Sequence, residues 1–335
     1  MRKRVPKQRA APEAAANVPV PDRRVMERMM RDIQRLLNEQ QFASAEEADA
    51  FLHQLLQEHG GKMPTLPADT PQQQAEDLVY QALETHGAPR VQLAQQALEI
   101  DPNCAEAYIL LAEETAHSLP EARDLFTKAM EAAERTLGDQ YFTDPEYAGH
   151  FWGLIETRPY MRARAALATI LWQLGERDAA IAHDQALLRL NPNDNQGLRY
   201  TLLTCLLAVG RLDAARTLYL QYKDEVSGTW AYLHALLVFR ETGPSARARK
   251  ALQKAFEVNH FAVLYLTGVK SLPQTPPPYH GFGDENEGIS VVYTTATAWI
   301  ETPGALEWLA EEFTRALEEF TARQAKTPQS RRKAG

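Results

Sequence analysis

A carboxylate and an imidazole share one face of a predicted helix at Glu113, Glu114 and His117. Glu113 and His117 are four residues apart, so they could offer two ligands to a divalent metal if a third came from elsewhere. The alternative is a solvated pair on a helix surface, which we favour because the nine histidines otherwise show no ligand spacing. We therefore expect no metal site and no cofactor.

A second group that could do chemistry consists of His150, Glu156 and Arg158. An imidazole, a carboxylate and a guanidinium so close in sequence could form a hydrolase or modifying-enzyme site within residues 141–162. However, the sequence contains no phosphate-binding glycine loop, no His-Glu-x-x-His, no nucleophile elbow and no Cys-x-x-Cys. We expect a protein that is not an enzyme and keep this site as the alternative.

Three arginines, Arg158, Arg162 and Arg199, stand in unusually polar connections between predicted helices. Together they could form a cationic pocket for a carboxylate or phosphate of a partner. Alternatively, they pair with Glu156 and Asp194 and stiffen the connections. The structural interpretation is the one we favour.

The elements that position these residues are helices arranged in repeats. Gly175, Gly210 and Gly243 recur at spacings of 35 and 33 residues. A small residue follows five positions after each glycine, namely Ala180, Ala215 and Ala248. A tetratricopeptide unit has about 34 residues in two antiparallel helices, whose tight turn and close crossing need small residues at fixed places. The sequence therefore predicts an all-α, tetratricopeptide-like solenoid of helical hairpins.

The repeats extend over residues 71–325, with an insertion at about 137–159 that is rich in aromatic residues. Residues 21–60 read as an N-terminal helix pair, and the segment after Asp284 reads as C-terminal capping helices. Residues 1–20 and 326–335 are basic and poor in aliphatic residues, so we expect disordered tails.

The first helix of the N-terminal pair has Val25, Met29 and Ile33 at helical spacing. These residues are expected to form the apolar side of the helix. Ser44 begins the second helix, and Glu47 completes a capping-box pattern three residues later.

A concave groove lined by the first helix of each hairpin is the usual contact surface of such a solenoid. Trp172, Tyr200 and Trp230 are the leading anchors, because aromatic side chains are enriched among binding hot spots. The alternative is that each packs beneath the insertion or the C-terminal segment. The remaining predicted groove residues are Arg162, Arg199, Arg240, Gln173 and Thr169.

Composition narrows the partner and the compartment. A formal net charge of −8 disfavours a nucleic-acid partner, and only the basic tails could bind one. The sequence contains no apolar run long enough for a membrane span, so we expect a cytoplasmic protein. Cys104 and Cys205 lie in helical apolar patterns and are expected to be buried thiols. The expected partner is a protein or peptide, whose identity the sequence leaves open, as it does the oligomeric state.

Three stretches of the sequence also carry a family resemblance. The first contains Ile-Asp-Pro-Asn at residues 100–103 and continues to Phe126, and the second joins Tyr160 to Gly175. The third, outside the repeat pattern, contains Gly-Asp at residues 283–284 and continues through Tyr293 and Trp299 to residues 304–306. With these residues the chain resembles the family related to the vertebrate suppressor-of-tumorigenicity-seven protein, over roughly residues 95–310.

This resemblance implies an all-helical, tetratricopeptide-like fold without a known catalytic site. The sequence departs from the vertebrate relatives because it lacks their hydrophobic N-terminal membrane segments. Membrane attachment and a growth-control role are therefore not carried over.

Overall fold

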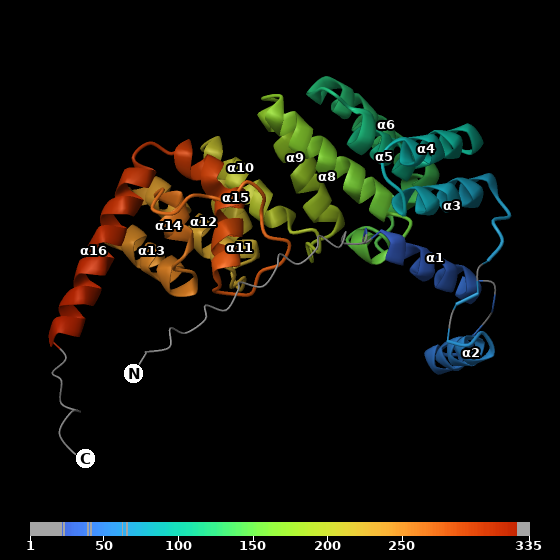
Figure 1. The fold of residues 1–335 in the computed structure, drawn as a ribbon, viewed down its shortest axis with the longest axis horizontal. Helices are drawn as coiled ribbons and strands as arrows, with labels where there is room; N and C mark the ends of the chain where they lie inside the picture. The colour runs from blue at the N-terminus through green and yellow to red at the C-terminus, as the bar shows by residue number, and fades with distance from the viewer. Residues whose placement is uncertain are drawn as a thin grey trace, which may run out of the picture. The chain divides into compact units, whose positions relative to one another are not determined.

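The structure is a computed structural model that describes residues 22–326, except residues 23, 39, 41, 62 and 65. Over these residues all regular structure is helical, as Figure 1 shows, so the predicted all-α class is confirmed. The expected tails, residues 1–20 and nearly all of 326–335, lie outside the described residues. No helix among the described residues is long and apolar enough to cross a membrane.

The chain divides into two compact units, Met1–Thr115 and Ala116–Gly335. The first unit contains α1 (Val25–Asn38), α2 (Ala45–Glu58), α3 (Pro71–Leu83), α4 (Ala88–Ile100) and α5 (Ala105–Thr115). The second unit contains α6 (Leu119–Leu137), α7 (Asp139–Thr143), the 3-10 helix η1 (Phe151–Gly153), α8 (Arg158–Gln173), α9 (Arg177–Leu190), α10 (Leu198–Ala208), α11 (Leu212–Gln221), α12 (Gly228–Thr242), α13 (Ala246–Val258), α14 (Ala262–Leu266), α15 (Glu285–Ile300) and α16 (Ala305–Lys326).

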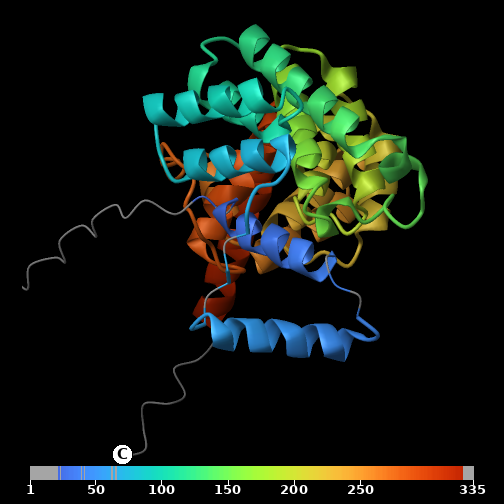
Figure 2. The same ribbon diagram turned by 90° about the vertical axis from the view of Figure 1, so that its right-hand side faces the viewer.

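Neighbouring helices pack as hairpins, as the sequence repeats predicted. The pairs are α3 with α4 (Figure 2), α8 with α9, α10 with α11, and α12 with α13. Gly175 and Gly210 end α8 and α10 with φ angles of +83° and +76°, a backbone conformation that favours glycine. We call the first helix of each repeat the A helix (α3, α5, α8, α10 and α12) and the second the B helix.

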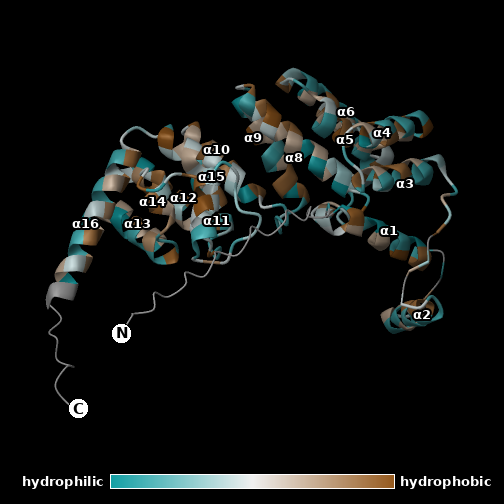
Figure 3. Ribbon diagram, in the orientation of Figure 1, coloured by the Kyte–Doolittle hydropathy of each residue, from teal (hydrophilic) through white to brown (hydrophobic). Residues whose placement is uncertain are grey.

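The alanines of the repeat lie where two helices cross. Ala180, Ala215 and Ala248 are all buried, which confirms the register inferred from the sequence. Hydrophobic and hydrophilic residues occupy different sides of the helices (Figure 3), as expected for helices that bury one side in a shared core.

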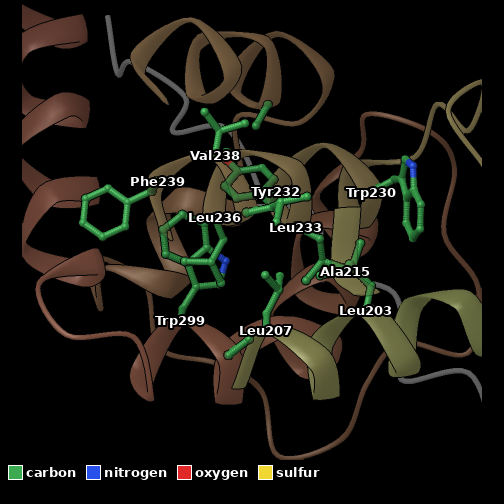
Figure 4. Close-up of a cluster of buried hydrophobic side chains, with 14 of the residues drawn as sticks. Leu203, Leu207, Ala215, Trp230, Tyr232, Leu233, Leu236, Val238, Phe239 and Trp299 are labelled. Carbon is green, nitrogen blue, oxygen red and sulfur yellow. The ribbon is translucent and has the colours of Figure 1, made fainter. Parts of the chain in front are cut away.

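The largest core lies in the second unit and combines several repeats. Leu203 and Leu207 of α10 meet Leu233 and Leu236 of α12, and Trp299 of α15 packs beside Leu236 (Figure 4). The helix α12 is buried on nearly all sides, because α10, α11, α13 and α15 all pack against it. The C-terminal segment is thus part of the core.

The insertion between α6 and α8 forms its own small aromatic cluster. The ring centroids of Phe142 and Phe151 are 5.3 Å apart, and that of Phe142 lies 5.1 Å from Tyr160 of α8. Phe151 and Tyr160 are fully buried, so this part of the insertion is packed against α8. Cys104 and Cys205 are unpaired and buried, as expected.

Candidate partner-binding surface

The predicted groove residues on α8 are the most accessible of the set. Thr169 and Gln173 are exposed, while Arg162 and Trp172 are half-buried. The guanidinium carbon of Arg177 lies 3.8 Å from the centroid of the Trp172 ring, a close cation–π contact. The accessible side of α8, together with Arg177 of α9, therefore presents an aromatic ring, a cation and two polar groups next to solvent.

Arg199 is held within the protein by ion pairs. Its guanidinium lies 2.8 Å from Asp194, pairs with Glu225 and stacks 4.3 Å from the ring centroid of Tyr200. Asp194 also accepts hydrogen bonds from the backbone N–H groups of Leu198 (2.7 Å) and Arg199 (2.9 Å). For Arg199 the structural interpretation is confirmed, because its partner is Asp194 as predicted.

The expectation that Trp230 is an exposed anchor is wrong. Its side chain is only 2% exposed and packs 5.6 Å from Tyr219 and 5.9 Å from Tyr200, centroid to centroid. Trp230 lies near the start of α12, and the neighbouring repeat covers it. Tyr200 is half-buried in the same cluster. Arg240 donates a hydrogen bond to Thr302, at 3.0 Å, and so is also used inside the second unit.

The chain itself covers the A helices α10 and α12, because α15 packs against both. A buried carboxylate fixes this arrangement. Glu287 of α15 accepts hydrogen bonds from the backbone N–H of Gly228 (2.8 Å), the side-chain amide of Asn259 (2.9 Å) and the backbone N–H of Gly283 (2.7 Å). Glu287 is 2% exposed, and Asn259 is fully buried.

The start of α15 is defined by Asp284, the predicted cap. Its carboxylate accepts from the backbone N–H groups of Glu287 (2.7 Å) and Gly281 (2.6 Å). These hydrogen bonds hold the pKa of Asp284 below its ordinary value. They explain why Gly283 and Asp284 stand out in the sequence beyond the repeat pattern, since both residues seat α15.

A second helix, α1, lies on the A helices of the first unit. Arg24 donates to Glu106 of α5 at 2.9 Å and to Glu113 at 3.0 Å. Arg24 directly precedes α1. Two turns later, Arg31 of α1 donates to Glu76 of α3 at 3.1 Å and to Asp77 at 2.9 Å. We call Glu76, Asp77, Glu106 and Glu113, together with Tyr80, the acidic face.

The pKa values of the acidic face and of α1 follow from this pairing. Burial raises the pKa of Glu76, and the charge of Arg31 opposes that effect only in part. For Arg24, burial alone would lower the pKa, but the hydrogen bond with Asp22 and the charges of Glu106 and Glu113 raise it. The arginines therefore stay charged.

The orientation of α1 agrees with the sequence prediction only in part. Val25 packs against the core of the first unit, and Ile33 is half-buried. Met29, which was expected on the packed side, is 48% exposed. Met26 and Met30 are also exposed, at 66% and 47%. The side with Arg24, Arg28 and Arg31 faces α3 and α5 instead. The spacing of these arginines at four and three residues is a signal that the sequence contains but that apolar periodicity does not reveal.

The two groups with catalytic potential have other partners. Glu113 binds Arg24 and lies 3.4 Å from Arg90, and no set of three metal-binding side chains occurs among the described residues. In the insertion, Glu156 accepts from the hydroxyl of Tyr141 at 3.1 Å. Arg158 donates to the backbone carbonyl of Trp152 at 3.0 Å, and His150 is exposed.

These features define a class of protein, an all-helical chain of tetratricopeptide-like hairpins whose A helices carry further helices of the same chain. Comparison with known proteins gives its relatives. The family model described as ST7 protein matches residues 55–192. This range includes the first two stretches that carried the resemblance, and the third stretch lies beyond it.

Several relatives are proteins of vertebrates. Suppressor of tumorigenicity 7 protein-like of Danio rerio is 27% identical over 262 residues, which cover 72% of this chain and 45% of that protein. The protein of the same name from Homo sapiens is 27% identical over 265 residues, covering 72% of this chain and 44% of that protein. Suppressor of tumorigenicity 7 protein of Macaca fascicularis is 27% identical over 237 residues, covering 63% and 43%. The resemblance to this family is confirmed, and the chain spans less than half the length of these relatives.

Proposed function

We propose that this chain is a non-catalytic adaptor that binds a helix or an extended peptide of a partner protein on its A helices. The observation that supports this most is the seating of α15 across α10 and α12. A surface that accepts one helix through shape and apolar contact has the geometry of a helix-binding groove. A cytoplasmic location belongs to the same proposal.

The site we propose for the partner is the accessible side of α8. Its centre is Trp172, flanked by Thr169 and Gln173, with Arg162 about two to three turns before them. Trp and Arg are enriched among binding hot spots, because they combine a large contact area with directional hydrogen bonds. Tyr200 of α10 is half-buried against Trp230, so we leave it out of this site.

The experiment is site-specific photo-cross-linking in cells that contain the native partner. A photoreactive amino acid at Gln173 would report on the α8 surface, and the same amino acid at Lys254 on α13 serves as the control. Lys254 has a side-chain exposure of 69%, so accessibility alone would let both positions react. Cross-linked peptides are then identified by mass spectrometry.

The proposal expects one reproducible partner segment at position 173 that is absent at position 254. Trp172→Ala should reduce this cross-link at least tenfold while helicity by circular dichroism stays unchanged. Equal cross-linking at both positions, or a cross-link that survives Trp172→Ala, would overturn the assignment of the site.

A further inference from the structure

We propose that the acidic face of α3 and α5 is a separate binding site for an arginine-bearing amphipathic helix of a partner protein, and that α1 is its resident occupant. This site belongs to the first unit and is distinct from the α8 surface. Either proposal can therefore fail while the other holds.

The recognition chemistry is visible in the ion pairs. Arg24 and Arg31 are seven residues apart, so their side chains leave the helix on the same side about 10 Å from each other. One meets carboxylates of α5 and the other carboxylates of α3. Two anionic points at this separation select a helix with arginines two turns apart.

Tyr80 adds selectivity for arginine. The guanidinium carbon of Arg31 lies 4.9 Å from the centroid of its ring. A planar guanidinium can stack on an aromatic ring and still donate to carboxylates at its edge, which the ammonium group of lysine cannot do. Lysine in the same position should therefore bind less well.

The burial of the acidic face explains why it needs a cationic ligand. The side chain of Glu106 is only 10% exposed, and that of Asp77 is 21% exposed. These exposures hold with α1 in place, so the carboxylates lose much of their hydration when a helix is seated on them, and that helix must offset the loss with cations. A helix that replaces α1 must therefore bring its own arginines.

The contacts of α1 make it replaceable. Asp32 is its only fully buried residue, Val25 is partly buried against the core of the first unit, and Met26, Met29 and Met30 remain exposed. By contrast α15 buries eight residues, including Ile289, Val292 and Trp299. Apolar burial contributes roughly 25 cal/mol per Å², so α1 has little of the stabilisation that fixes α15. The neighbouring helix α2 has no buried side chain, so α2 does not anchor α1 to the rest of the first unit.

The test measures binding of a labelled synthetic peptide with the sequence of residues 22–38 to the full chain by fluorescence anisotropy. The protein variant Arg24→Gln/Arg31→Gln weakens the resident helix. We expect at least tenfold tighter peptide binding to this variant than to the wild type, since an occupied site must open first. The affinity should fall as salt is raised from about 50 to 300 mM, because screening weakens the ion pairs.

Two controls separate specific recognition from general attraction to an acidic protein. A peptide in which Arg24, Arg28 and Arg31 are Gln should not bind. Adding Glu106→Gln/Glu113→Gln to the protein variant should abolish binding of the arginine peptide. Adding Glu257→Gln/Glu318→Gln instead, at exposed positions of the second unit, should leave it unchanged. Equal binding of both peptides, or binding that survives the first pair of substitutions, would overturn the proposal.

A second measurement needs no substitution in α1. Hydrogen exchange of the wild-type chain at saturating arginine peptide should speed up in α1 as the peptide displaces it, and the Gln peptide should have no effect. Unchanged exchange in α1 under saturation would show that the resident helix is fixed, and would overturn the proposal even if the double variant did not fold.

Discussion

Asp184 is a carboxyl group in α9 that is 3% exposed. Burial, together with the nearby charge of Asp194, raises its pKa to about 7. The ordinary value is 3.8, so between about pH 4 and pH 7 the folded protein binds a proton that the unfolded chain has lost. The contribution of Asp184 to the free energy of unfolding should therefore rise as the pH falls from 8 towards 5.

We predict that Asp184→Asn is more stable than the wild type at pH 8, by about 1–3 kcal/mol, and has nearly the same stability at pH 5. Thermal unfolding at both pH values measures this. Asp178→Asn is the control on the same helix, because that side chain is 82% exposed. A difference between Asp184→Asn and wild type that does not change with pH would contradict the account.

Gly288 is the tightest position in the seat of α15. A Cβ atom there would lie 2.7 Å from the Cβ atom of Phe261 and 2.9 Å from the backbone nitrogen of Ala262. Gly288→Ala should reduce the free energy of unfolding by about 1–3 kcal/mol, since backbone atoms must move. Gly153→Ala should be nearly neutral, because no atom lies within 4 Å of the new Cβ. Urea unfolding of both variants and the wild type measures this difference.

At the scale of residues, the sequence could identify the turn glycines and the crossing alanines, because each role depends on local backbone and size. It could not decide whether Trp230 is a contact or a core residue. Aromatic side chains are common both in cores and at binding surfaces. Trp230 belongs to the core because Tyr219 of the preceding repeat packs against it.

The helices α1 and α15 represent two ways of seating a helix on A helices. The contact of α15 combines apolar burial with one satisfied carboxylate, whereas that of α1 depends mainly on ion pairs at the acidic face. Partly exposed ion pairs contribute little to the free energy of unfolding, and salt weakens them further. Salt does not screen buried apolar contacts. The two helices should therefore differ in how readily they leave.

The seating of α15 can be tested through its carboxylate. Glu287→Ala removes the acceptor of three N–H donors, two of them buried and one partly buried, and should lower the free energy of unfolding by about 3–5 kcal/mol. Glu287→Gln keeps one carbonyl oxygen and should cost less. Urea unfolding followed by tryptophan fluorescence reports on this region, because Trp299 and Trp308 are both buried in it. Equal stability of the alanine variant and wild type would refute the role of this network.

At the scale of elements, helical periodicity predicted most helices, including the one that Asp284 caps. The docking of α15 and α1 could not be predicted, because it joins residues 45 to 89 positions apart through polar groups that no local pattern relates. The predicted groove over α10 and α12 was a reasonable expectation for repeats alone, but the chain supplies its own helix to that surface.

For the whole molecule, the fold class and the family resemblance followed from repeats and short stretches distributed along the sequence. The match to residues 55–192 and to vertebrate relatives confirms that resemblance, and the shared name carries no chemistry. The division into two units was not foreseen, since the repeat pattern runs through it without interruption. Because neither the name of the relatives nor the division into units indicates a function, the adaptor proposal depends on the surface that the A helices present.

The most direct test of this proposal is hydrogen exchange of the full chain with and without the partner segment identified by cross-linking at Gln173. We predict slower exchange in the A helix α8, with no change in the B helices α9, α11 and α13. Slower exchange confined to the B helices, or no change in any repeat, would contradict the claim that this protein binds its partner on the A helices.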